Sequence, residues 1–125
     1  MNKRVNLIIG SGVLGAYLSA ELLKNRQIVI VTSRSLNKNF TNYKYLKIKN
    51  KIKFEKLNTN KKNEIEKIIK KYKPKKIFYF SGQSSLTKSI KNKKETFDSH
   101  FTGTKNFLVF LKKEELNIKF YKANS

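Results

Sequence analysis

Residues 5–15 read VNLIIGSGVLG, and the interpretation of the whole chain starts from this pattern. Its first part, Val5–Ile9, is a short apolar run, which is typical of a strand buried on both faces of a sheet. Its second part, Gly10–Gly15, has the spacing G-x-G-x-x-G and leads into Gly12–Lys24, where the apolar residues repeat with the period of a helix. A glycine motif at such a junction predicts a dinucleotide-binding site.

Each glycine of this motif is expected to have a different role in the site. Gly10 permits a tight turn, Gly12 lets a pyrophosphate approach the backbone, and Gly15 lets the helix pack close to the strand. The first amides of the helix, at Val13 and Leu14, have no helical acceptor and carry a partial positive charge that favours phosphates. We expect these five residues to bind the dinucleotide; a glycine turn without a ligand is the alternative.

Further candidate strands are distributed along the chain. The segments rich in β-branched and aromatic residues are Gln27–Thr32, Ile77–Ser81 and Ile118–Ala123, and one weaker strand is expected within Leu46–Phe54. Ser33–Tyr45 is mostly polar and is interpreted as a loop. Together with the first strand, these segments predict a sheet of five strands.

Amphipathic helices alternate with the strands. One is expected to be capped by Asn58–Asn60 and ended by Pro74. Its apolar face consists of Ile65, Ile68, Ile69 and Tyr72. Another spans about Thr96–Glu115, and its apolar face consists of Phe97, Phe101, Phe107, Leu108 and Leu111.

This alternation predicts right-handed crossovers and a parallel sheet. The expected fold class is α/β, a Rossmann-type doubly wound parallel sheet. We interpret residues 1–125 as the N-terminal portion only, a single and incomplete NAD(P)-binding domain whose C-terminal substrate part is absent.

The end of the second strand indicates which cofactor is preferred. Domains that prefer NAD usually place an Asp or Glu there, to bind the ribose 2′-hydroxyl. This chain has Thr32-Ser33-Arg34-Ser35 and no acid. Arg34 could pair with a 2′-phosphate, and Ser33 and Ser35 could donate hydrogen bonds to it. We expect NADP, with NAD as the alternative; that Arg34 is one more solvated cation stays open.

The composition excludes several classes of protein. With 125 residues and no cysteine, the chain suits one domain without a disulfide or a thiolate metal site, and no metal is expected. The net charge of +21 could indicate nucleic-acid binding, but the lysines are spread over the whole chain, and A/T-rich codon usage explains them. Nucleic acid is therefore not an expected partner. No membrane span or signal peptide is evident, so a cytoplasmic location is expected.

Three short motifs resemble a known family. Ser81–Ser85 reads SGQSS, and with Gly15–Ser19 and Gly103-Thr104 it is similar to the extended short-chain dehydrogenase/reductase family of NAD-dependent epimerases and dehydratases. Within it, the chain most resembles the GDP-mannose 4,6-dehydratases. The resemblance implies a nucleotide-sugar substrate and a complete enzyme that is a homo-oligomeric lyase. That enzyme would convert GDP-mannose to GDP-4-keto-6-deoxymannose, by moving a hydride from C4 to C6 through NADP with loss of water across C5–C6.

The resemblance also implies roles for individual residues. Ser33 and Arg34 would face the adenosine ribose or its phosphate, and Leu57 would lie at the adenine, after Lys56, where the family has an Asp. The nicotinamide and the reacting sugar would be contacted by residues that follow the later strands. These are Ser81, Gly82 and Gln83 on the nicotinamide side, Ser84 toward the sugar nucleotide, and Ser125 as the catalytic hydroxyl.

The catalytic Tyr-x-x-x-Lys pair of the family would lie beyond Ser125, so the chain alone is expected to be inactive. Three pairs fit the bare pattern, and we interpret them as coincidences in a lysine-rich sequence: Tyr43–Lys47, Tyr45–Lys49 and Tyr72–Lys76. Two other functions stay open. One is a nucleotide-sugar epimerase or reductase of the same family, and the other is a non-catalytic dinucleotide-binding module.

Overall fold

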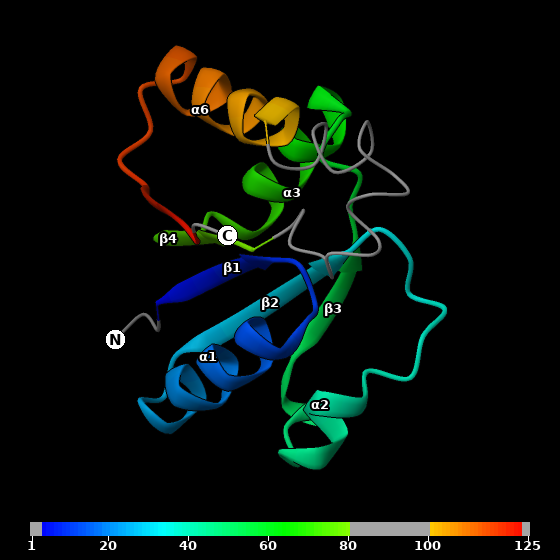
Figure 1. The fold of residues 1–125 in the computed structure, drawn as a ribbon. Coiled ribbons are helices and arrows are strands. Elements are labelled where there is room, and N and C mark those ends of the chain that lie inside the picture. Colours follow the sequence, from blue (N-terminus) through cyan, green and yellow to red (C-terminus); the bar gives the residue numbers. More distant parts are fainter. Residues whose placement is uncertain (1–3, 81–100, 124–125) are drawn as a thin grey trace.

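The computed structural model describes residues 4–80 and 101–123, which form a five-stranded parallel sheet of order β3-β2-β1-β4-β5 flanked by helices (Figure 1). The strands are β1 Val5–Ile9, β2 Ile28–Ser33, β3 Lys53–Lys56, β4 Lys76–Tyr79 and β5 Lys119–Lys122. The helices are α1 Val13–Lys24, α2 Thr41–Tyr45, the 3₁₀ turn η1 Lys49–Lys51, α3 Lys62–Tyr72 and α6 Gly103–Lys113. The predicted α/β parallel fold is confirmed.

The apolar run that begins the chain forms the central strand. In β1, Leu7 pairs with Ile30 of β2 on one side and with Ile77 of β4 on the other. The strand order reverses at β1, because β2 and β3 extend to one side while β4 and β5 extend to the other. In open α/β sheets, ligands bind at the carboxyl ends of the strands beside such a reversal. The glycine motif directly follows β1 at that point.

Helices cover both faces of the sheet, as the doubly wound prediction requires. In Figure 1, α1 and α2 lie on one side of the sheet, and α3 and α6 lie on the other. Successive side chains of a strand point to opposite faces. Ile8 therefore packs with the α1 and α2 side chains, whereas Leu7 and Ile9 pack with those of α3 and α6. In the part of the chain that the structure describes, no helix is long and apolar enough to cross a membrane.

Two expectations for residues 33–56 were wrong. Ser33–Tyr45 is not all loop, because it ends in α2. This helix is held by Tyr43, which is fully buried and makes edge-to-face contacts with Phe40 and Phe54. The weak strand lies at Lys53–Lys56 rather than earlier, because its position is set by pairing with Ile30–Ser33 of β2.

The helix expectations also need correction in detail. α3 has the predicted buried face, but its N-cap is Lys61 rather than Asn58–Asn60, and no side chain caps it there. Within the described residues, α6 spans Gly103–Lys113; its predicted first part lies outside them. Phe107 and Leu111 are buried as expected. Leu108 is 48% exposed, because α6 turns only a narrow stripe toward α3 and the sheet, and Phe101, which precedes α6, is 59% exposed.

Burial of Tyr43 predicts that the domain loses stability at alkaline pH. Burial raises the pKa of its hydroxyl far above the ordinary value. Above pH about 10, Tyr43 therefore ionises in the unfolded chain but stays protonated in the folded chain. The stability that Tyr43 contributes to the fold is complete at lower pH and is lost as the pH rises. We expect the free energy of unfolding to fall less steeply between about pH 9 and 11 in Tyr43→Phe than in the wild type. Equal slopes in urea titrations of the two proteins would contradict this expectation, since lysine ionisation is common to both.

Candidate dinucleotide-binding site

The turn after β1 requires a glycine at its first position. Gly10 has a φ of 109°, a conformation that side chains with a Cβ rarely adopt. Its amide donates a hydrogen bond of 3.1 Å to the carbonyl of Thr32 at the end of β2. The turn is therefore tied to the neighbouring strand, and its shape is fixed before any ligand arrives.

The other two glycines of the motif differ in what surrounds them. A Cβ added to Gly12 would have no atom of the described residues within 4 Å, so among them the space in front of this residue is open. A Cβ added to Gly15 would lie 3.0 Å from the Gly10 carbonyl oxygen, 3.0 Å from the Tyr43 hydroxyl and 3.3 Å from an Ile8 methyl group. Gly15 is thus needed for packing of α1, whereas Gly12 leaves room for a ligand.

The N-terminus of α1 is exposed and has the electrostatics of an anion site. Gly12 is its N-cap; no side chain caps it, and no acidic residue occupies the first turn. The first bond of the helix runs from the Ala16 amide to the Gly12 carbonyl at 3.1 Å. The preceding amides of Val13 and Leu14 therefore lack helical acceptors, and both residues are more than half exposed. Such an end favours a phosphate through its amides and the helix dipole.

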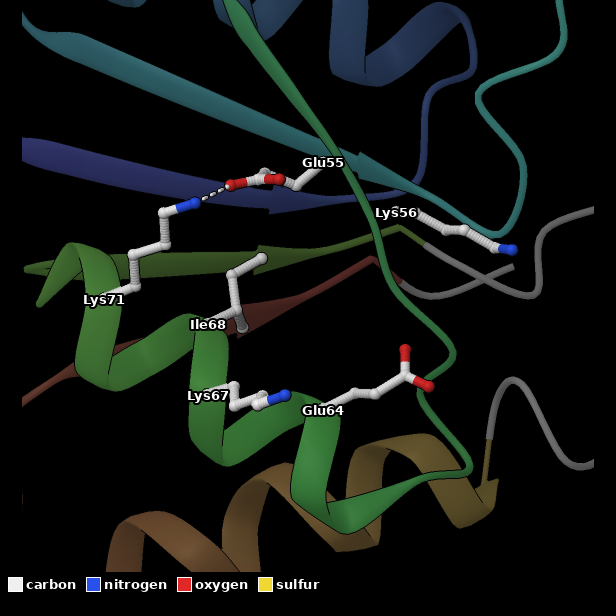
Figure 2. Close-up of a pocket in the computed structure, with 6 residues that line it drawn as sticks. All are labelled: Glu55, Lys56, Glu64, Lys67, Ile68 and Lys71. Atoms are coloured by element: carbon white, nitrogen blue, oxygen red, sulfur yellow. Dashed lines mark hydrogen bonds and ion pairs between the residues drawn. The ribbon is translucent and has the colours of Figure 1, made fainter.

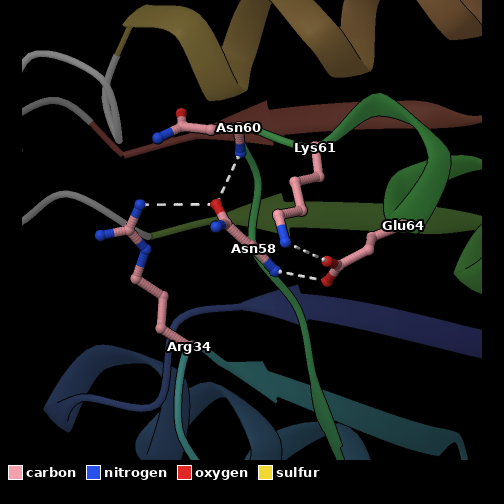
Figure 3. A network of polar contacts seen from close by, with 5 residues as sticks. All are labelled: Arg34, Asn58, Asn60, Lys61 and Glu64. Atoms are coloured by element: carbon pink, nitrogen blue, oxygen red, sulfur yellow. Dashed lines mark hydrogen bonds and ion pairs between the residues drawn. The ribbon is translucent and has the colours of Figure 1, made fainter.

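The adenosine end of the expected site contains a network of polar contacts (Figure 3). Ser33 is buried at the end of β2, and Arg34 after it is exposed. An Arg34 Nη donates to Asn58 Oδ1 at 3.5 Å, and the same oxygen accepts the Asn60 amide at 3.0 Å. Asn58 thus forms a turn that directs its carbonyl oxygen toward the guanidinium.

The carboxylate of Glu64 lies on the other side of Asn58 from Arg34, as Figure 3 shows. It accepts the Asn58 amide at 3.0 Å, and its second oxygen lies 3.8 Å from the ammonium of Lys61. Glu64 therefore stabilises the turn before α3 instead of neutralising Arg34. The sequence could have suggested this contact between Asn58 and Glu64 only if the N-cap of α3 had been placed correctly, at Lys61.

The remaining expected site residues are either buried or outside the described residues. The side chain of Leu57 is 2% exposed in the core and its amide donates to the Ser33 carbonyl at 2.9 Å, so only its remaining backbone atoms could face a ligand. Lys56 beside it is exposed. Ser81, Gly82, Gln83, Ser84 and Ser125 lie outside the described residues. In the described ranges 4–80 and 101–123, no group of three His, Asp or Glu residues could hold a metal ion.

Lys38 lies beside the glycine motif, a contact that the sequence did not reveal. Its Nζ donates to Ser11 Oγ at 3.0 Å, although the two residues are 27 positions apart. Ser11 lies inside the glycine motif, so this contact joins the loop after β2 to the turn after β1. A polar loop without periodicity carries no signal for such a contact.

A concavity of about 210 Å³ lies between β3 and α3, away from the glycine motif, and is shown in Figure 2. Glu55 on its wall bonds to Lys71 at 2.9 Å and to the Tyr72 hydroxyl. The hydrogen bond from Tyr72 and the contact with Lys71 lower the pKa of the Glu55 carboxyl. The ion pair of Glu55 with Lys71 joins β3 to α3, so we interpret it as a contact that ties α3 to the edge strand. The concavity shares no lining residue with the glycine motif.

A family model described as GDP-mannose 4,6 dehydratase matches residues 7–125, nearly the whole chain. The chain belongs to the GDP-mannose 4,6 dehydratase family. Among curated relatives of this family member, the UDP-glucose 4-epimerase of Mycoplasma genitalium is 27% identical over 122 residues, which are 98% of this chain and 36% of the relative. The chain therefore spans about a third of that relative's length.

Solved structures share the fold of this family member but differ in activity. L-Threonine dehydrogenase from Clostridium difficile superposes with a TM-score of 0.79 at 26% identity, covering 100% of this chain and 37% of its own. UDP-glucose 4-epimerase from Thermotoga maritima, solved with UDP-glucose, gives 0.79 at 19%, covering 97% and 38%. dTDP-glucose 4,6-dehydratase from Bacillus anthracis, solved with NAD, gives 0.73 at 21%, covering 95% and 36%. The Rossmann-type fold is thus common to all three.

Proposed function

We propose that this chain is the NADP-binding part of a nucleotide-sugar 4,6-dehydratase. The observation that carries the proposal is the open space at Gly12 in front of the first amides of α1, which have no acceptor within the helix. A diphosphate placed there would meet the helix end without meeting a side chain. Val13 and Leu14 would donate their amides to it, and Gly10 and Gly15 would maintain the turn and the packing of the helix behind it.

The adenosine end supports NADP over NAD. Arg34 follows β2 and Lys56 ends β3, and the two strand ends are neighbours because Ser33 pairs with Lys56. A 2′-phosphate would find two cations and the hydroxyls of Ser33 and Ser35, and a guanidinium binds phosphate well because its donors are arranged in a planar fork. NAD is the alternative, since the epimerase of Brucella ovis and the dehydratase of Bacillus anthracis were solved with NAD.

Replacement of Arg34 tests the choice of cofactor. We expect Arg34→Gln to weaken NADP binding by about 10- to 100-fold and to leave NAD binding unchanged, because a hydrogen bond to a charged group contributes about 1.5–3 kcal/mol. Arg26→Gln is the matched control, since Arg26 is an exposed arginine that follows α1. Calorimetric titration of both cofactors measures the effect. An equal loss for NAD and NADP would show that Arg34 does not bind the 2′-phosphate.

The proposed reaction depends on residues beyond the glycine motif. Bound NADP supplies the hydride acceptor and donor; Ser81, Gly82 and Gln83 would orient its nicotinamide side, and Leu57 its adenine side through the backbone. Ser84 would face the sugar nucleotide, and the Ser125 hydroxyl would hydrogen-bond to the reacting sugar oxygen. A nucleotide-sugar epimerase is the second candidate, because the curated Mycoplasma relative, at 27% identity, is an epimerase.

The two candidate reactions differ in the mass of the product. A dehydratase acting on GDP-mannose releases one water, whereas an epimerase leaves the mass of its nucleotide sugar unchanged. We propose to incubate the complete protein with GDP-mannose or UDP-glucose, to measure loss of water by mass spectrometry, and to detect stereoisomers by chromatography that separates them. Loss of water from GDP-mannose would support the dehydratase, and a change of UDP-glucose to a stereoisomer would support the epimerase. Cofactor binding with no product from either sugar would favour a non-catalytic module.

A further inference from the structure

We propose that Lys38 binds the pyrophosphate of the dinucleotide and that Ser11 positions its ammonium over the glycine turn. This inference rests on the proposed dinucleotide function. It assigns a third cation to the site, separate from Arg34 and Lys56, and places it at the diphosphate rather than at the adenosine phosphate.

The contact between Lys38 and Ser11 places the ammonium beside the expected phosphate position. Lys38 Nζ lies 3.0 Å from Ser11 Oγ, and Ser11 stands between Gly10 and Gly12. The next residue, Gly12, faces open space at the exposed end of α1. A diphosphate bound to the first amides of α1 would therefore come within reach of the lysine, whose four-carbon stem is flexible.

The loop that carries Lys38 is anchored two residues later. Phe40 is 8% exposed, and its ring lies 4.3 Å from that of Phe54 and 6.1 Å from that of Tyr43, between centroids. Its φ of 50° is unusual for a bulky residue, so packing must hold it in place. The ammonium of Lys38 lies 6.0 Å from the centre of the same ring. The aromatic cluster thus restricts where Lys38 can extend.

The ammonium of Lys38 has spare hydrogen-bond donors for an anion. It has three N–H groups. Its hydrogen-bond partner Ser11 is neutral, and the salt bridges found among the described residues do not include Lys38. A diphosphate could therefore accept a hydrogen bond from Lys38 without first displacing a carboxylate. The amides of α1 and this cation would then bind the same diphosphate from two elements.

The experiment compares ligands that share a pyrophosphate. Binding of NADP, NAD and ADP is measured by titration calorimetry for the wild type, Lys38→Met and Lys44→Met. Lys44→Met is the matched control, since Lys44 is an exposed lysine of α2. We expect Lys38→Met to weaken all three ligands by about 10-fold and to reduce the salt dependence of binding, because a charged hydrogen bond is lost. Lys44→Met should bind as the wild type does, and the thermal unfolding of all three proteins should coincide.

Ser11→Ala tests the positioning role. We expect it to weaken binding less than Lys38→Met does, and to have no further effect in the Lys38→Met background, because Ser11 acts through the lysine. The inference is overturned if Lys38→Met binds ADP as tightly as the wild type, or if its loss is confined to NADP. If the wild type binds none of the three ligands, the proposed function itself is rejected. The two failures are therefore distinguishable.

Discussion

Gly12→Val is expected to abolish NADP binding while the domain stays folded. Gly12 has a φ of −85° and a ψ of −164°, an extended conformation that valine adopts readily. A Cβ at this position meets no atom of residues 4–80 and 101–123 within 4 Å. The new side chain would instead occupy the space in which the pyrophosphate approaches the backbone. Calorimetric titration should detect no binding, and the thermal unfolding midpoint should be close to that of the wild type.

Gly15→Ala provides the contrast, since it lies three residues further along the same motif. Its Cβ would lie 3.0 Å from a backbone carbonyl and 3.0 Å from the Tyr43 hydroxyl, so the helix must shift away from β1. We expect a loss of stability of about 1–3 kcal/mol, typical of overpacking, measured by urea unfolding. The site assigned to Gly12 would be rejected if Gly12→Val bound NADP normally, or if it unfolded as readily as Gly15→Ala.

Gly103→Ala is expected to destabilise the domain more than Gly15→Ala does, although each substitution adds a single methyl group. Gly103 begins α6, and its added Cβ would collide with the Tyr79 hydroxyl and lie 2.7 Å from Thr59 Oγ1. The same helix turn is fixed by a 2.9 Å hydrogen bond from Asn106 Nδ2 to the Thr59 carbonyl. Displacing it would also loosen Phe107, which is fully buried against Tyr79. We expect a loss of about 3 kcal/mol or more, a large part of the stability of a small domain.

Urea unfolding monitored by circular dichroism measures this loss, with Lys105→Ala as a control on the exposed side of the same helix. Tyr79→Phe removes the nearest colliding atom. In the Gly103→Ala background it should recover about 1 kcal/mol, less than the full loss because the contacts with Thr59 remain. If Gly103→Ala were as stable as Lys105→Ala, the close packing of α6 against β4 would be wrong.

Some parts of the fold were predictable because their signals are local. β1 and β2 are buried on both faces and therefore read as continuous apolar runs. α3 buries one stripe, so Ile65, Ile68 and Ile69 recur at helical spacing. α2 was missed because its five residues make little more than one turn, too few for a periodic pattern. β3 was misplaced because its position depends on pairing with β2 and not on its own lysine-rich sequence.

In the candidate site, too, some features were predictable from the sequence and others were not. The spacing of Gly10, Gly12 and Gly15 predicted a phosphate-binding turn, because backbone freedom is a property of the glycines themselves. The contact of Lys38 with Ser11 joins residues 27 positions apart, and only the packing of Phe40 brings them together. Sequence alone therefore determined the parallel α/β fold and the location of the turn. Only the tertiary structure decided which glycine faces open space, which one is enclosed by packing, and which lysine lies beside the turn, since each of these depends on atoms distant in the chain.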